Sequence, residues 1–367
     1  MNQNKTTSRE PLFHVVKRPE RSGHQMLLFR LGAVALSILA GGLFILAIGY
    51  NPIEIYGTIL NGAFRSKIAV QSTIKITIPL CISALGATLA FKMKFWNIGG
   101  EGQIIMGGVF ATYFALFHAD WPHLPLMIVC FLAGLIGGGV WGLIPALFKV
   151  KWNTNETLLT LMLNYIALYI ISWLQNGPWR DPTANGFPKI AAFAKNAVLG
   201  KVLGVQAGWI VMLVFTVLVW VYLKFTKQGY EVAVVGESQD TARYAGIHVK
   251  KVILRTMFLS GAIGGVCGML QACGTDATLS TGIAGGVGFT AIIVAWLCQL
   301  NPGMILVVSF LFGVLEKGSG VVQSSYGLST DCAAVLQGII LFFILASEFF
   351  VRYAFAGRSS AKGGKKA

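Results

Sequence analysis

The stretch GYEVAVVGESQDTARYAGI, from Gly229 to Ile247, is a polar island between two long apolar runs, Val205–Leu223 and Val252–Ala272. Its charged side chains are Glu231, Glu237, Asp240 and Arg243, and Lys224, Lys227, Lys250 and Lys251 flank it. A charged residue at the centre of a membrane helix costs roughly 2.5–3.5 kcal/mol on insertion scales. The island therefore lies in water, and the two runs beside it are membrane spans.

A short helix is predicted inside this island. Ser238 suits a helix N-cap, and Gly246 suits the left-handed position just past a helix end. About two turns fit between them, and Asp240 lies three residues before Arg243 on the same side. Small side chains fill one face: Thr241, Ala242 and Ala245. Two interpretations stay open, a solvated loop that caps two helices or an ordered helix on which a partner protein docks.

The composition of the chain indicates an all-α, polytopic membrane protein. Of its 367 residues, 55% are hydrophobic and 12% are charged, and the mean hydropathy is +0.69. A soluble protein carries about 25% charged residues. The net charge of +15 comes mainly from the tails and alternate loops, which indicates anionic lipid and not nucleic acid as its counterpart.

About ten spans follow from the apolar runs. We expect them at residues 27–49, 74–91, 102–118, 125–148, 156–174, 205–223, 252–272, 289–300, 304–316 and 333–355. Residues 50–72 read as a polar loop or interfacial segment. The eighth span is short, as in a broken helix completed by the residues just before it, and Asn301-Pro302-Gly303 predicts a tight turn after it. Glycines of the fourth span permit close helix contact.

The expected organisation is a basic tail at 1–25, a transmembrane domain at 26–356 that includes the loop 224–251, and a second basic tail at 357–367. The positive-inside rule places both tails and the loop in the cytoplasm. Basic residues between Arg180 and Lys201 are the exception, because they fall in a long outside loop where the rule is weaker. No internal repeat is evident.

The segment FWNIGGEGQ, Phe95 to Gln103, joins the second and third spans. Its glycines allow a tight, non-helical backbone, and Glu101 stands at a helix start, where the helix dipole favours a carboxylate. One interpretation is a turn with a capping acid. The other is an irregular segment that lines a water-filled path, because broken backbone at membrane depth persists only where it is buried or lines a cavity.

Polar residues in the later spans pose a similar choice. The run from Asn153 to Thr157 predicts a helix N-terminus by its capping-box spacing. Asn164 lies inside the fifth span beside Tyr165 and must find a partner, either another helix or a substrate. Gln271 and Asp276, near the outer end of the seventh span, raise the same alternatives.

Several chemistries have no sequence support. We find no GxxxxGK[ST] loop, no HExxH, no GxSxG and no metal-ligand cluster, so the chain is expected to be neither an enzyme nor a holder of a cofactor. The cysteines lie in or at the ends of apolar runs and are expected to be small buried hydrophobes. No span carries the paired ionisable groups of a proton-driven relay, which disfavours a secondary transporter.

Four stretches together carry a family resemblance. They are FWNIGGEGQ at Phe95–Gln103, NETLLTLMLNYIA at Asn155–Ala167, VVGESQDTARYAGI at Val234–Ile247, and GVGFTAIIVAWL at Gly286–Leu297 followed by NPG. With them the chain resembles permease subunits of bacterial ABC importers, in the branch of ribose-type sugar permeases and, more closely, the larger of the two nucleoside permeases of basic-membrane-protein-type systems. Lys94 and the span end Trp296-Leu297-Cys298 depart from the usual pattern, and the latter weakens a sugar assignment.

The resemblance implies a subunit of an ATP-driven importer in a bacterial cell membrane, with nucleosides as the expected substrates and simple sugars as the alternative. It implies as partners a separate ATPase that holds ATP and Mg, a second permease subunit as a heterodimer, an external substrate-binding lipoprotein and membrane lipid. The implied coupling residues are Gly236, Glu237, Ser238, Asp240, Ala242, Arg243, Tyr244, Ala245 and Gly246. Candidate pathway residues, all by inference, are Asn97, Glu101, Gln103, Asn164, Tyr165 and Phe289.

Overall fold

The computed structural model describes residues 13–17, 23–328 and 353–357, with scattered positions between 335 and 346. The chain divides into two compact units, one formed by residues 1–57 with 327–367 and the other by residues 58–326. The predicted tenth span, 333–355, lies largely outside the described residues.

The first unit holds helix α1 (Gly23–Ala47), which covers most of the predicted first span. It also holds a two-stranded antiparallel sheet in which β1 (Phe13–Lys17) pairs with β4 (Tyr353–Gly357), with Phe13 opposite Gly357. β4 corrects the predicted end of the tenth span, because residues 353–355 are strand. Tyr and Phe alternate with small residues there, a pattern that suits a strand as well as an apolar helix.

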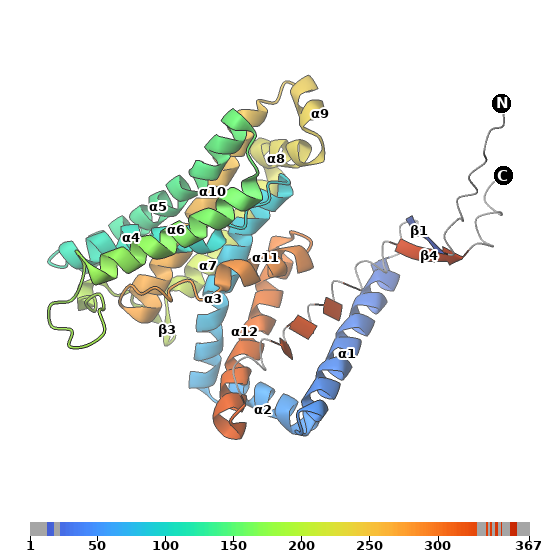
Figure 1. Cartoon of the computed structure of the whole chain (residues 1–367), viewed down its shortest axis with the longest axis horizontal. Coiled ribbons are helices and arrows are strands. Elements are labelled where there is room, and N and C mark those ends of the chain that lie inside the picture. Colours follow the sequence, from blue (N-terminus) through green and yellow to red (C-terminus); the bar gives the residue numbers. More distant parts are fainter. Residues whose placement is uncertain are drawn as a thin grey trace, which may run out of the picture. The chain divides into compact units, whose positions relative to one another are not determined.

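The second unit is a bundle of helices (Figure 1). Its helices are α2 (Pro52–Phe64, which begins in the first unit), α3 (Lys67–Lys92), α4 (Gly100–Phe117), α5 (His123–Trp152), α6 (Glu156–Asn176), α7 (Gly208–Phe225), α8 (Lys227–Glu237), α9 (Gln239–Tyr244), α10 (Val249–Leu270), α11 (Val287–Leu297) and α12 (Pro302–Tyr326). A π-helical turn, η2 (Gln271–Asp276), extends α10, and a short 3-10 turn, η1 (Lys195–Ala197), lies in the 177–207 segment. That segment also forms a small hairpin, β2 (Lys201–Val202) with β3 (Val205–Gln206).

Helices α4, α5 and α10 form the centre of this unit and pack on one another through glycine. A methyl group added at Gly265 of α10 would overlap the Gly134 carbonyl oxygen of α5. One added at Gly268 would overlap the Ile104 carbonyl oxygen of α4. The backbones therefore touch without side chains between them, as the glycines of the predicted fourth span indicated. We call this contact the glycine seam.

Six described helices are long and apolar enough to cross a membrane, or seven if the bent pair formed by α1 and α2 counts as one span. They are α3, α5, α6, α7, α10 with its π-helical turn, and α12. The chain is thus a multi-pass helical membrane protein. Within the described residues, α4 and α11 do not qualify as full spans, which differs from the predicted count of ten.

Several predicted boundaries were wrong for a shared reason. α3 begins at Lys67 and not at 74, with Ser66 as its N-cap, and α2 fills much of the predicted polar segment 50–72. α12 runs to Tyr326 and not to 316. Polar residues in end turns lower the local hydropathy, although such side chains can reach water from a helix that continues. The residues before α11 are irregular, so they do not complete a broken helix there.

Candidate functional site

The predicted irregular segment exists, and it is buried. Residues 95–98 are non-helical between the end of α3 and the start of α4, and Asn97 is 3% exposed. Lys94 adopts a left-handed backbone (φ 56°) just before it, which is the position that departs from the family pattern. The surroundings of this segment decide between the two predicted interpretations.

Asn164 of α6 holds this segment by both ends of its amide. Its Oδ1 accepts a hydrogen bond from the Gly102 N–H at 2.8 Å, and its Nδ2 donates to the Ile98 carbonyl at 2.8 Å. One turn earlier, the Thr160 hydroxyl accepts from the Ile98 N–H at 3.2 Å. The backbone groups of Ile98 and Gly102, which have no partner within a helix, are thus hydrogen-bonded by side chains of a neighbouring helix. Of the two predicted partners of Asn164, another helix or a substrate, the structure shows the first: Asn164 links α6 to the start of α4.

Asn97 and Gln103 form a second polar cluster on the α10 side. The two amides exchange hydrogen bonds at 3.4 Å, and Asn97 also donates to the Ser260 hydroxyl at 3.4 Å. Ser260 in turn donates to the Gly86 carbonyl of α3 at 2.7 Å. The side chains border a small cavity that Gly288 and Ile292 of α11 help to line.

Glu101 joins α4 to α11. Its Oε1 accepts a hydrogen bond from the Gly288 N–H at 2.7 Å, which places a carboxylate at the N-terminus of α11, where the helix dipole favours negative charge. At the other end of α11, the Trp296 ring stacks on Trp96 at 5.5 Å. The segment from Trp96 to Glu101 therefore runs antiparallel along α11, a helix of 11 residues.

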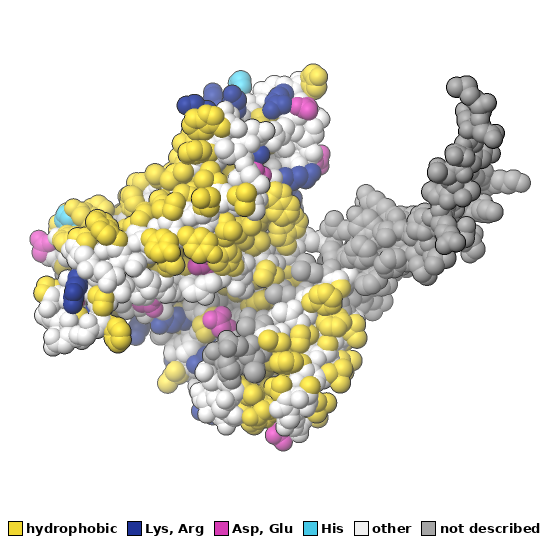
Figure 2. Space-filling view, viewed as in Figure 1, with side chains coloured by type: hydrophobic (Ala, Val, Ile, Leu, Met, Phe, Trp, Pro, Cys, Tyr) yellow, Lys and Arg dark blue, Asp and Glu magenta, His cyan; other side chains and the backbone are white. Residues whose placement is uncertain are grey.

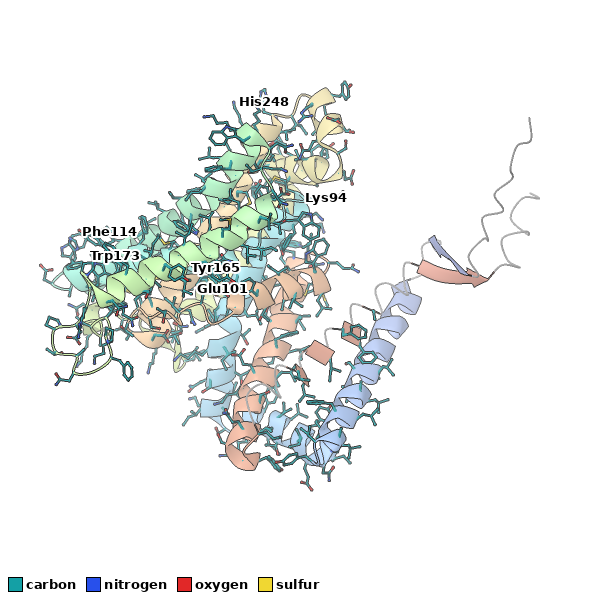
Figure 3. The ribbon with its side chains drawn as sticks, viewed as in Figure 1. Lys94, Glu101, Phe114, Tyr165, Trp173 and His248 are labelled. Carbon is teal, nitrogen blue, oxygen red and sulfur yellow. The ribbon has the colours of Figure 1, made fainter. Side chains whose placement is uncertain are left out.

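The two helices fail as full spans for different reasons. α11 has 11 residues and covers only about 16 Å, whereas α4 has 18 residues and covers about 27 Å, but its first turn carries the polar Glu101 and Gln103. Their two N-termini face each other across the Glu101 carboxylate. Glu101 and Tyr165 lie midway along the length of the bundle in Figure 3, between Lys94 and His248 at one end and Phe114 and Trp173 at the other.

The six candidate pathway residues thus fall into two groups. The four polar ones, Asn97, Glu101, Gln103 and Asn164, are each at most 8% exposed and bond within the chain. Tyr165 is 58% exposed and Phe289 is 43% exposed, and both face outward from the bundle. Gln271, for which the sequence left a helix or a substrate as partner, has a partner within the chain. Its side-chain oxygen accepts a hydrogen bond from the Thr275 hydroxyl at 2.9 Å.

The polar island folds as predicted at its centre. Ser238 caps α9 by accepting a hydrogen bond from the Thr241 N–H at 3.2 Å, and Gly246 ends it with φ 75°. Arg243 pairs with Asp240 at 2.6 Å. Helix α8 before it was not predicted as a separate helix. Thr226 caps α8, and Glu231 of α8 pairs with Arg255 of α10 at 3.1 Å.

Two residues expected on the docking face are inside the chain. Ala242 is 0% exposed and packs in a cluster with Val232 and Val249, among others. Gly236 abuts the backbone of Lys92 at the end of α3, with no room for a side chain. The remaining expected residues are exposed or half-exposed, and Tyr244 is 94% exposed. The inner face of α9 therefore packs against the bundle, and its outer face is exposed.

Lys and Arg side chains gather at the α8–α9 end of the bundle, as Figure 2 shows. Exposed lysines there include Lys151, Lys227, Lys250 and Lys251. Lys149 pairs with Glu156 across the α5–α6 turn at 2.9 Å. These basic residues share one end of the bundle, whereas Arg65, Lys67 and Lys195 are exposed in other segments, and the cytoplasmic orientation of that end stays a prediction.

Sequence reasoning missed Thr160, Ser260 and Gly288 as partners of the candidate residues. Thr160 and Ser260 are isolated hydroxyls in apolar runs, which is a weak signal. Gly288 is part of the GVGF motif, and its role depends on a contact with Glu101 across 187 positions. Cys81, Cys130, Cys267, Cys273 and Cys298 are free and buried, as expected.

The chain was compared with known proteins. Residues 69–345 match the family described as branched-chain amino acid transport system / permease component. The chain is 30% identical to the glucose ABC transporter permease protein TsgB13 of Haloferax volcanii, over 88% of this chain and 89% of that protein. It is 30% identical to the guanosine ABC transporter permease protein NupP of Bacillus subtilis, over 92% and 97%. It is 29% identical to the nucleoside ABC transporter permease protein NupB of Lactococcus lactis subsp. cremoris, over 91% and 96%.

Proposed function

Because this chain belongs to the family of branched-chain amino acid transport system permease components, we propose that it is the permease subunit through which an ATP-driven ABC importer takes up nucleosides. It is a transport component and not an enzyme. The proposal rests on two observations together: this family match, and the helix α9, whose inner face packs within the chain and whose outer face is exposed. The proposed location is a bacterial cytoplasmic membrane, with both tails on the cytoplasmic side.

Nucleosides are the favoured substrate class because NupP and NupB are named for guanosine and nucleoside transport and align with nearly all of this chain. Simple sugars are the second candidate, because TsgB13 is named for glucose and is equally similar. The departure of Trp296-Leu297-Cys298 from the small-residue ending of sugar permeases weakens the sugar assignment more than it supports nucleosides.

The proposed partner at α9 is a separate ATPase subunit, which would hold the ATP and Mg. The exposed residues Glu237, Asp240, Arg243, Tyr244 and Ala245 are the proposed contact surface, with Ser238 and Gly246 setting its shape. Gly236 and Ala242 support this surface from inside. Further proposed partners are a second, different permease subunit and an external lipoprotein that delivers the substrate.

The contacts of α8 and α9 suggest how movement would pass from the ATPase to the membrane. Ala242 packs in the cluster that contains Ala90 of α3, Ala146 of α5 and Met257 of α10. When the ATPase subunits close on ATP, a pull on α9 would tilt these helices as one body, because rigid elements linked at a packed contact move together. Alternating access would follow without chemistry in this chain.

The substrate path is proposed to run beside this chain and not through it. Asn97, Glu101, Gln103 and Asn164 act as the scaffold that fixes the starts of α4 and α11. Tyr165 and Phe289, which have exposed rings, are the proposed residues that face the path, between this chain and the second permease subunit.

Transport by the reconstituted complex tests the function. Proteoliposomes with this chain, the ATPase, the second permease and the binding lipoprotein are expected to accumulate labelled guanosine when ATP is present, with unlabelled adenosine but not ribose or glucose as competitor. Vesicles with this chain alone should accumulate nothing. Uptake that glucose inhibits and adenosine does not would support the sugar alternative, and accumulation by this chain alone would contradict an ABC permease.

A further inference from the structure

A groove of about 720 Å³ opens between α3, α7, α12 and the β2–β3 hairpin, at the end of the bundle opposite α9. Ile74 of α3, Met212 of α7 and Phe310 of α12 are among its lining residues, and all lie within the second unit. Its size falls in the range of about 300–1,000 Å³ that is typical of small-molecule sites. The network around Asn97 and Glu101 takes no part in it.

The length of the groove along α3 matches the thickness of one membrane leaflet. On α3 it is lined from Lys67 to Thr77. At a rise of 1.5 Å per residue these positions span about 15 Å, which is half of a hydrocarbon core about 30 Å thick. The groove thus begins near the headgroup level and ends near the bilayer midplane.

The lining of the groove is apolar, and most of its polar side chains already have hydrogen-bond partners within the chain. Gln71 donates its amide to the Leu203 carbonyl at 2.9 Å, and Thr77 donates its hydroxyl to the Thr73 carbonyl at 2.9 Å. The Trp209 indole N–H donates to the Val202 carbonyl at 3.3 Å. Because a nucleoside or a sugar would lose its own hydrogen bonds here without replacement, a polar solute does not fit.

The rim of the groove carries positive charge. Lys67 is the first residue of α3, and the neighbouring Arg65 is also exposed. Neither has an ion-pair partner among the described residues. The N-terminus of a 26-residue helix adds its own partial positive charge at the same point. A phosphate at this rim would be bound by the ammonium group and the helix end together.

We infer that this groove binds one anionic phospholipid, with its phosphate at Lys67 and an acyl chain along α3 toward Phe310. The length of the groove, its apolar lining and its cationic rim each match one part of such a molecule. In the proposed orientation this lipid belongs to the outer leaflet. The inference does not depend on which solute the importer carries.

Lipid binding by the purified full chain tests this site. Dissociation constants for the first bound lipid are measured by native mass spectrometry, with phosphatidylglycerol and phosphatidylcholine of the same acyl composition as probes. Ile74→Trp fills the groove, and Ile68→Trp is the matched control, because Ile68 is 74% exposed on α3 and does not line the groove. Lys67→Glu reverses the rim charge, and Lys227→Glu, at the first residue of α8, is its control.

We expect phosphatidylglycerol to bind more tightly than phosphatidylcholine. Lys67→Glu should weaken phosphatidylglycerol binding by at least about fivefold, which corresponds to the loss of one lysine near an anionic headgroup, and leave phosphatidylcholine unchanged. Ile74→Trp should remove the tight site for both lipids. Ile68→Trp and Lys227→Glu should bind both lipids as the unchanged protein does.

Two results would overturn the inference. If Ile74→Trp binds as much lipid as Ile68→Trp, then another segment of this chain or a second copy covers the groove. If Lys67→Glu and Lys227→Glu weaken binding equally, then the rim holds no specific headgroup. Lys67→Glu alters an exposed side chain, so it keeps the test valid even if Ile74→Trp fails to fold.

Discussion

The carboxylate of Glu101 accepts a hydrogen bond from the amide of Gly288 at 2.7 Å, and this bond joins the starts of the two helices α4 and α11. Its strength comes from the charge of the acceptor and from burial, since Glu101 is 8% exposed. The bond therefore fixes α11 against α4 at the point where both backbones are irregular.

Replacing Glu101 tests this bond. Glu101→Ala leaves the Gly288 N–H buried and unpaired, which should lower the free energy of unfolding by about 1–3 kcal/mol. Glu101→Gln retains an oxygen that can accept the same bond and should cost less. Thermal unfolding of the purified protein in detergent measures both. Equal midpoints for Ala and Gln variants would show that the hydrogen bond contributes little.

Asn164 should tolerate no substitution that alters one end of its amide. Asn164→Asp keeps the acceptor for Gly102 but places a second oxygen against the Ile98 carbonyl, and Asn164→Leu removes both bonds. Each buried group left unpaired costs about 1–3 kcal/mol. We expect both variants to unfold at lower temperature than the unchanged protein. A wild-type midpoint for Asn164→Leu would contradict the tether.

The glycine seam should reject a single methyl group. Gly265→Ala would overlap α5 at Gly134 and force the helices apart, at a cost of about 1–3 kcal/mol. Gly320→Ala in α12 is the control, because nothing lies within 4 Å of the added methyl group. The control should be neutral or stabilising by up to about 1 kcal/mol. Similar losses in both variants would mean that helix packing is not the cause.

Ala242 of α9 and Ala245, the C-cap of that helix, should respond differently to the same change. Ala245→Arg alters an exposed position, so we expect an intact membrane fold that no longer co-purifies with the ATPase. Ala242→Arg places a charge in the cluster with Val232 and should prevent folding. Size-exclusion profiles and ATPase retention are measured together. Full ATPase retention by Ala245→Arg would argue against docking at α9.

Local signals in the sequence predicted some features well. Ser238 and Gly246 marked the ends of α9, because cap residues act through neighbouring backbone groups. The apolar runs predicted α5, α6 and α7 nearly to their bounds. The family motifs predicted the permease family, which the comparison confirms.

Features that depend on contacts between residues far apart in the chain could not be predicted from the sequence. Ala242 and Ala245 are the same residue type three positions apart, and only the packing of α8 and α10 decides which one is buried. Glu101 reads as a helix-capping acid for α4, yet the amide it holds belongs to α11. The start of α3 at Lys67 was missed because a hydropathy pattern registers a lysine as polar wherever its ammonium group lies.

The mutual pairing of Asn97, Gln103 and Ser260 has a consequence for the route that a solute can take. Each of these side chains already has a hydrogen-bond partner inside the chain. A polar solute that entered this layer would therefore have to break existing bonds before it could form its own. A route along the outside of the bundle demands no such exchange, so this chain is suited to form one wall of a passage.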